Sequence, residues 1–258
     1  MLRYRFLFEQ MMRRELRQKY KGSALGVLWY LVNPVVLMGA YALVFSVLLR
    51  VANIDDYPLF LIAGLIVWVF FAQALLAAAP SLVENAPLVR KVRFPREAIP
   101  ASVATVQLAT FVVMLVIVTP VALVVRDSFD PALLVLPLVV VLLFCLVLGL
   151  SLALSVLHAH FRDVEPVLAA ALLPWFFVTP IFLRVEDLPG LDDRQWLSDL
   201  IEWANPIAPF VAAVRDVLYS GAAPSAGHMA YLAAVGLGAL ALGLLVFRRM
   251  ERDLAVVV

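Results

Sequence analysis

Six long apolar stretches, none with an acidic or basic residue near its centre, limit what this chain can fold into. A helix needs about twenty apolar residues to cross the roughly 30 Å hydrocarbon core of a bilayer. The composition agrees, because 64% of the residues are hydrophobic and only 15% are charged, whereas soluble domains average about 25% charged. The sequence therefore predicts an all-α integral membrane protein with six transmembrane helices, at residues 24–49, 58–80, 98–125, 132–157, 164–183 and 228–247.

The basic residues of the connecting segments predict how these spans are oriented. Of the 20 Lys and Arg residues, 15 fall in the N-terminal arm, the second-to-third and fourth-to-fifth connections and the C-terminal tail. Connections that face the cytoplasm carry an excess of Lys and Arg. We therefore expect a multi-pass protein of the cytoplasmic membrane with both termini in the cytoplasm, which an even number of spans also requires.

The N-terminal arm, residues 1–22, is predicted to form an amphipathic helix at the cytoplasmic interface of the membrane. Leu7, Phe8 and Met11 fall on one arc of a helical wheel, and most of the basic residues fall on another. A helix with one apolar and one basic face suits an anionic leaflet. The arm could equally be a topology anchor with no further role. Its basic residues include Arg13, Arg14, Arg17, Lys19 and Lys21.

Residues 81–95, between the second and third predicted spans, contain a short helix with well-marked ends. Asn85 can cap this helix, Pro87 fits its first turn, and Glu84 lies at its positive end. A plain turn would suffice to connect two spans, so the extra helix predicts a docking surface for a cytoplasmic partner. Its negative end carries basic residues and a stop, namely Arg90, Lys91, Arg93, Phe94 and Pro95.

The second internal connection, residues 158–165, is compact and charged. His158, His160 and Asp163 are potential metal ligands, but their spacing matches no common metal site. A polar cluster at the membrane edge explains them without a metal, so we assign no metal site here. Arg162 and Asp163 are a second candidate contact for a cytoplasmic partner.

The longest connection, residues 184–227, is predicted to lie on the outer side. Apolar and charged residues alternate at helical spacing on both sides of Asn205-Pro206, which predicts two short amphipathic helices within about residues 193–220. These helices could rest on the outer surface, or they could re-enter the membrane and shape a pore exit. The pattern leaves both readings open.

The sequence lacks the groups that an ATPase or an ion-coupled carrier needs. None of the three lysines precedes Ser or Thr, so the chain has no nucleotide-binding P-loop. The spans carry no central charged residue, which argues against a proton- or ion-coupled carrier. No nucleophile–base set or carboxylate pair stands out. We therefore expect no enzymatic activity and no cofactor in this chain.

Aromatic residues are concentrated in three of the predicted spans. Most such rings in membrane proteins belong to interfacial belts or to ordinary packing. The alternative is a channel lining on which sugar rings stack without fixed charges. The candidate lining residues are Trp29, Tyr30, Tyr41, Trp68, Phe70, Phe71, Trp175 and Phe176.

Three segments together resemble a known family. Residues 16–29, which include Tyr20-Lys21-Gly22-Ser23, and the following Asn33-Pro34 closely resemble the entry into the first span of ABC-2 type permeases that export polysaccharides. Residues 88–97 resemble the first coupling helix of that family, and residues 205–215 resemble the segment before its last span. The resemblance covers the whole chain in order. It implies an interface helix at 1–22 and a six-helix ABC-2 transmembrane domain at 23–258, with the coupling helix at about 84–96.

The resemblance implies a permease subunit that moves a lipid-linked polysaccharide of the O-antigen, teichoic acid or capsule type. It implies a homodimer working with two copies of a separate ATPase that binds ATP and Mg²⁺, and it implies no nucleic acid. In this family the N-terminal arm would admit the lipid pyrophosphate, and residues 193–220 would form an outer gate. The residues implied to contact the ATPase are Glu84, Asn85, Leu88, Arg90, Lys91, Arg93, Phe94, Arg162 and Asp163.

Two other functions fit the same sequence. An ABC-2 exporter of drugs or small lipids would share the architecture but would need only a lateral pocket instead of a continuous channel. A membrane scaffold without transport activity would need neither an ATPase nor a cargo.

Overall fold

The computed structural model describes residues 5–18, 32, 35–36, 39–40, 43–44, 54–91, 94–183, 196 and 203–254 of the 258-residue chain. Most of the predicted first span and most of the first predicted outer helix lie outside these residues. Several predicted site residues also lie outside them, as do the side chains of Arg17 and Lys91. These residues are Lys19, Lys21, Trp29, Tyr30, Tyr41 and Arg93.

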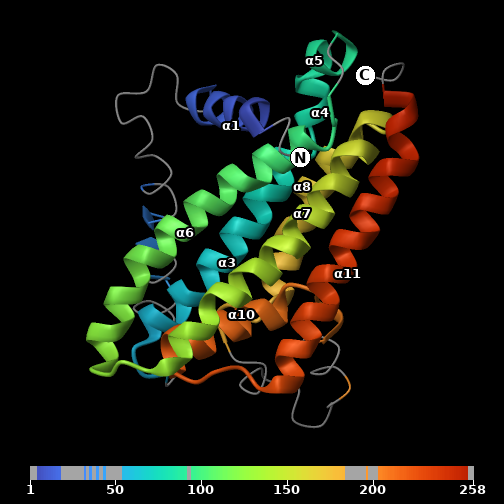
Figure 1. Cartoon of the computed structure of the whole chain (residues 1–258). Helices are drawn as coiled ribbons and strands as arrows, with labels where there is room; N and C mark the ends of the chain where they lie inside the picture. Colours follow the sequence, from blue (N-terminus) through green and yellow to red (C-terminus); the bar gives the residue numbers. More distant parts are fainter. Residues whose placement is uncertain are drawn as a thin grey trace.

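Four long apolar helices form the body of the molecule (Figure 1). They are α3 (Tyr57–Ala78), α6 (Ala98–Arg126), α7 (Leu136–His160) with the preceding 3-10 turn η4 (Pro131–Val135), and α11 (Ala226–Met250). All four are long and apolar enough to cross a membrane. Their bounds lie close to those of the predicted spans, because charged residues flank each apolar stretch. Every regular element in the described part of the chain is helical.

The predicted span at 164–183 is shorter than expected. Helix α8 (Val164–Val178) has 15 residues, about 22 Å at 1.5 Å per residue, which is less than the roughly 30 Å of a hydrocarbon core. It ends because Pro180 disfavours the helical conformation for the residue before it, and Thr179 is extended with ψ of 130°. The described residues therefore contain four helices of spanning length, not the five predicted between 58 and 247.

Helices α7 and α11 pack with their backbones in direct contact. Gly243 of α11 faces the carbonyl of Gly149 on α7, and Gly236 faces the carbonyl of Leu142. A Cβ atom at Gly236 would lie 2.5 Å from the Leu142 oxygen, so a side chain there has no room. Small residues allow such close approach between membrane helices. We call this contact, made by Gly149, Gly236 and Gly243, the glycine seam.

One end of the bundle is closed by α10 (Ala208–Arg215) and the π-helical turn η7 (Asp216–Ser220). Helix α10 buries seven of its eight residues, including Phe210 and Val214, against the main core. In Figure 1 it lies across the lower ends of the long helices. Of the two readings for this segment, the described second helix is therefore embedded in the bundle and does not rest on its surface.

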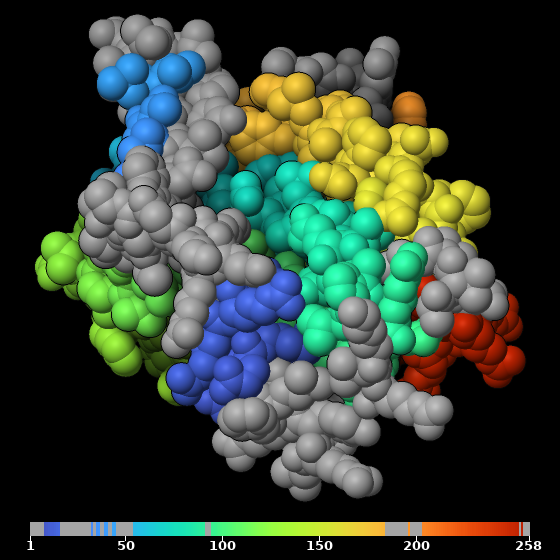
Figure 2. Space-filling model, turned by 90° about the horizontal axis from the view of Figure 1, so that it is seen from above, coloured from blue at the N-terminus to red at the C-terminus, as the bar shows by residue number. Residues whose placement is uncertain are grey.

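The other end carries the short helices α1 (Arg5–Gln18), α4 (Ser81–Glu84) and α5 (Ala86–Lys91). A small second core holds them to the long helices. Viewed from above, α1 and α5 lie beside each other, and the end of α11 lies on the far side of α5 from α1 (Figure 2). The second core consists of Met11, Leu82, Val89, Ile99, Leu152, Val156, Ala159, Phe247 and Leu254.

Candidate functional site

The predicted coupling helix is present as two short helices, α4 and α5, which meet at Asn85. Leu82 and Val89 point into the second core and fix the pair on α6 and α7. Glu84 and Arg90 are exposed on the opposite side. The pair thus presents charged side chains outward while its apolar side chains hold it to the long helices.

Asn85 and Phe94 support this pair instead of extending outward. Asn85 is only 6% exposed, and its side-chain amide donates to the Ser81 carbonyl oxygen at 2.8 Å. Its backbone carbonyl accepts from Leu88 and Val89 at the start of α5. Phe94 packs against the second core, and Leu88 is half-buried.

The turn between α7 and α8 lies at the same end of the bundle. Arg162 and Asp163 are exposed there. The ring of His158 is buried, and its Nδ1 accepts from the Glu165 backbone N–H at 3.3 Å. The ring of His160 contacts the Val156 carbonyl at 2.9 Å. Both histidines thus order the turn on which Arg162 and Asp163 are displayed.

Helix α1 contacts α6. Met11 is buried in the second core. Arg13 and Arg14 are exposed, and Arg13 forms an ion pair with Glu9 at 2.7 Å. An exposed pair of this kind contributes well under about 1 kcal/mol, so Arg13 can exchange Glu9 for another anion at little cost.

An aromatic cluster joins α3 to α8 within the bundle. Trp68 lies 5.5 Å from Phe176 and 6.4 Å from Trp175, measured between ring centroids. Beside it a small apolar pocket of about 210 Å³ opens between the two helices. Its lining residues are Leu65, Trp68, Ala72, Leu76, Leu172, Leu173 and Phe176.

Four of the predicted channel aromatics, Trp68, Phe70, Phe71 and Phe176, are buried core residues of this chain, and two of these do not line the pocket. Phe70 stacks on Phe111 of α6 with ring centroids 4.8 Å apart. Phe71 is completely buried and packs edge-on against Trp175 at 5.2 Å. Within one chain, the pocket is therefore bordered by Trp68 and Phe176, whereas Phe70 packs on α6 and Phe71 packs on α8 beside the pocket.

Polar side chains connect the end of α8 to the segment before α10. The Trp175 indole Nε1–H donates to the Asn205 side-chain oxygen at 2.9 Å, and the Asn205 amide donates to the Thr179 hydroxyl at 3.0 Å. The same Asn205 oxygen accepts from the Ile207 backbone N–H at 3.3 Å. Asn205 thus ties the segment before α10 to the end of α8.

Arg215 is the site residue that sequence reasoning missed. The charge pattern places Arg215 in the longest, outer connection, among the five basic residues that lie outside the internal segments. It is nevertheless only 7% exposed. Its guanidinium lies 3.7 Å above the Phe60 ring centroid and donates to the carbonyls of Pro180 at 3.1 Å and Ile181 at 2.9 Å. Gly64 of α3 leaves room for it, because a Cβ there would lie 2.6 Å from Nη2. The signal in the sequence is a single arginine at the end of the otherwise apolar stretch from Ile207 to Val214.

A family model described as "ABC-2 type transporter" matches residues 7–219. The chain belongs to this family. The match covers nearly all of α1 together with α3 to α8 and α10, so the short helices at both ends and the aromatic cluster lie within the matched part of this ABC-2 permease. The resemblance read from the sequence is therefore confirmed at the level of the family.

Curated relatives of this ABC-2 permease are transport proteins of similar length. The "O-antigen export system permease protein RfbA" of Myxococcus xanthus is 30% identical over 90% of this chain and 87% of that protein. A protein of the same name from Klebsiella pneumoniae is 27% identical over 92% of this chain and 89% of its own length. The "Polysialic acid transport protein KpsM" of Escherichia coli is 25% identical over 94% and 93%.

Proposed function

We propose that this chain is the membrane-spanning subunit of an exporter that moves a lipid-linked polysaccharide of the O-antigen type across the cytoplasmic membrane. The observation that carries the proposal is the 30% identity to an O-antigen export permease over 90% of this chain. The sequence adds a physical requirement, because a chain without a P-loop needs a separate ATPase as its source of energy.

The ATPase would dock on the end formed by α4, α5 and the α7–α8 turn. In this proposal the ATPase contacts the exposed side chains of Glu84, Arg90, Arg162 and Asp163. Asn85, Leu88 and Phe94 keep the short helices in shape, and Lys91 and Arg93 would add positive charge. Because Leu82 and Val89 fix these helices on α6 and α7, a displacement of the ATPase would be transmitted to the long helices.

The cargo would pass along the side of the bundle that carries Trp68 and Phe176. The described residues that line their pocket are all apolar or aromatic, which suits the C–H faces of sugar rings. A pocket of about 210 Å³ is too small for a glycan chain, so a second copy of the permease would complete the passage. We therefore propose a homodimer, in which Trp29, Tyr30 and Tyr41 extend the same lining.

The lipid end of the cargo would enter beside α1. The exposed guanidinium groups of Arg13 and Arg14 can bind phosphate oxygens, and Arg17, Lys19 and Lys21 would add to this positive surface. At the opposite end, α10 and η7 would form the outer gate. This arrangement requires six spans with both termini in the cytoplasm, of which α8 and the following residues to 183 form the fifth.

Reconstitution in proteoliposomes with the cognate ATPase tests the cargo. We expect a lipid-linked O-antigen to stimulate ATP hydrolysis and to reach the far side of the membrane, whereas the lipid carrier without a glycan stimulates less. Stimulation by small amphipathic drugs, with none by the lipid-linked glycan, would show a drug or small-lipid exporter instead.

Co-purification with the ATPase tests the docking surface. Replacing Arg90 and Arg162 by Glu should release the ATPase from the purified complex. The same change at Arg13, an exposed arginine on α1, should leave the complex intact. Retention of the ATPase by the Arg90→Glu, Arg162→Glu variant would exclude this surface.

A further inference from the structure

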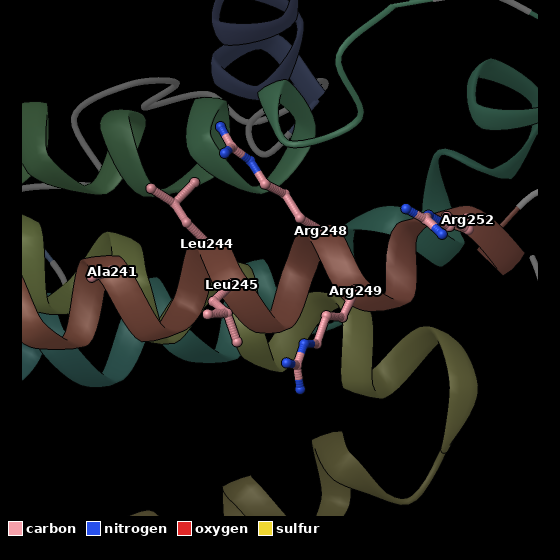
Figure 3. Close-up of a pocket in the computed structure, with 6 residues that line it drawn as sticks. All are labelled: Ala241, Leu244, Leu245, Arg248, Arg249 and Arg252. Carbon is pink, nitrogen blue, oxygen red and sulfur yellow. The ribbon is translucent and has the colours of Figure 1, made fainter.

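The end of α11 that shares a core with α1 and α5 carries an open groove that the proposed transport path does not use. The groove has a volume of about 610 Å³. All of its described lining residues come from α11 and the turn that follows it, η8 (Glu251–Asp253) (Figure 3). They are Ala241, Leu244, Leu245, Arg248, Arg249 and Arg252.

The groove has an apolar half and a basic half. Residues three and four apart share a helix face, so Leu244 and Leu245 lie on the same faces of α11 as Arg248 and Arg249, respectively. Figure 3 shows Leu244 and Arg248 on one flank of α11, Leu245 and Arg249 on the other, and Arg252 farther along the helix. The three arginines therefore lie at one end of the groove, beyond its apolar residues.

These arginines have no described counter-charge. None of them forms an ion pair with another described side chain, and all three are exposed. The nearby Glu251 does not line the groove, and its carbonyl accepts from Arg96. The C-terminal end of a helix dipole supplies only about half a negative charge, which cannot balance three guanidinium groups.

The apolar half faces outward from the bundle. Only 22% of the most apolar window of α11 is buried within the chain. Leu245 is 50% exposed, and the neighbouring Leu242 is 65% exposed. In a membrane, such a face is in contact with acyl chains. A ligand for the whole groove must therefore combine an acyl chain with an anionic group at the depth of the membrane interface.

We propose that this groove binds one anionic phospholipid of the surrounding membrane. Its phosphate lies among Arg248, Arg249 and Arg252, and an acyl chain lies along Ala241 and Leu245. The planar guanidinium groups can each present two N–H donors to phosphate oxygens. A water-soluble acidic protein could satisfy the arginines but not the apolar half, which is why the lipid fits better. The bound lipid is distinct from the transported one.

Lipid titration of the delipidated full-length chain tests this proposal. The permease in detergent is titrated with phosphatidylglycerol or with phosphatidylcholine of the same acyl chains, and bound lipids are counted by native mass spectrometry. We expect preferential retention of phosphatidylglycerol. The double variant R248Q/R249Q should bind it about thirtyfold more weakly, because each basic residue near an anionic lipid contributes roughly a fivefold factor. If this variant does not fold, R249Q/R252Q should show the same loss.

The matched control is R90Q/R162Q, which removes two exposed arginines from the same end of the bundle and should bind phosphatidylglycerol as the unmodified chain does. Equal retention of the two lipids, or an equal loss in the control, would overturn the proposal.

Displacement of the lipid by millimolar inorganic phosphate would also overturn it and would assign the arginines to a free anion. Release of the ATPase by R248Q/R249Q, with lipid binding intact, would make this face a protein-docking surface. The lipid count requires neither ATP nor glycan, so it is independent of the proposed function.

Discussion

Arg215 offers a direct measure of how much a buried cation contributes to this bundle. Replacing it by Met keeps the volume similar and the environment apolar. The change removes the cation–π contact with Phe60 and the donors to the Pro180 and Ile181 carbonyls. Both carbonyls lie just after the end of α8 at Val178.

The magnitude follows from two opposing effects. Leaving a buried acceptor without its donor costs about 1–3 kcal/mol each, and a desolvated cation–π contact contributes about 2 kcal/mol. Against this, burying a guanidinium costs several kcal/mol in desolvation, and Met avoids that cost. Because the Ile181 carbonyl is buried and the Pro180 carbonyl is partly buried, we expect the loss to exceed the gain. The expected net destabilisation is about 2–4 kcal/mol, a fall in Tm of roughly 5–15 °C for a chain of this size.

Thermal unfolding of the purified chain in detergent measures this change. Arg162→Met removes an exposed arginine and should leave Tm unchanged. Gly64→Ala places a Cβ 2.6 Å from the Arg215 Nη2, so it should also destabilise, but much less when Arg215 is already Met, because the two residues are in contact. A Tm of Arg215→Met at or above that of the unmodified chain would refute the reasoning and show that desolvation dominates.

Three further predictions address the rest of the fold. Gly243→Leu should cost about 1–3 kcal/mol or more by forcing α7 and α11 apart, whereas Gly238→Leu, at a position with open space around it, should leave thermal unfolding nearly unchanged. Asn205→Ala should destabilise by about 1–3 kcal/mol because it leaves the Trp175 indole N–H without its acceptor, and an unchanged Tm would show that water replaces Asn205. The topology can be tested by placing a single cysteine at exposed Phe129 or at Arg162 in a Cys145→Ser background. In intact cells, a membrane-impermeant maleimide should label the cysteine at position 129 but not the one at position 162. The opposite labelling would invert the proposed topology.

The long helices could be predicted closely from the sequence, but the end of α8 could not. α3, α6 and α7 are apolar runs between charged residues, and α11 is an apolar run that starts at the Ser225 cap and ends at Arg248 and Arg249, so the sequence predicts their ends to within a few residues. The run after Val164 stays apolar to Leu183, and hydropathy therefore predicts a full span. The backbone instead leaves the helical conformation at Thr179 because of Pro180. A hydropathy window does not register this local steric effect.

The site could be predicted in part, and the failures share one cause. The exposed charges of Glu84, Arg90 and Arg162 could be predicted because charge in a short connection is visible in the sequence, and their role in docking stays a prediction. The roles of Trp68 and Phe70 could not be separated, since which neighbouring helix each ring meets depends on packing. Arg215 was missed for the same reason. Its partners at Phe60 and Ile181 come from segments 155 and 34 residues away, and only the fold brings them together.

The bundle is held together in two physically different ways, and the difference bears on where it can open. Along the glycine seam, α7 and α11 touch backbone to backbone, so any separation leaves an empty gap that no side chain can fill. Around the break of α8, the aromatic cluster packs α8 against α3, and the further contacts are hydrogen bonds from Asn205 and Arg215, which can be exchanged for other partners or water at a net cost of about 1 kcal/mol each. A passage that widens between α8 and its neighbours therefore costs less than one between α7 and α11. The Trp68–Phe176 pocket lies on this less costly side, so the structure places its apolar lining next to the helix that is easiest to move.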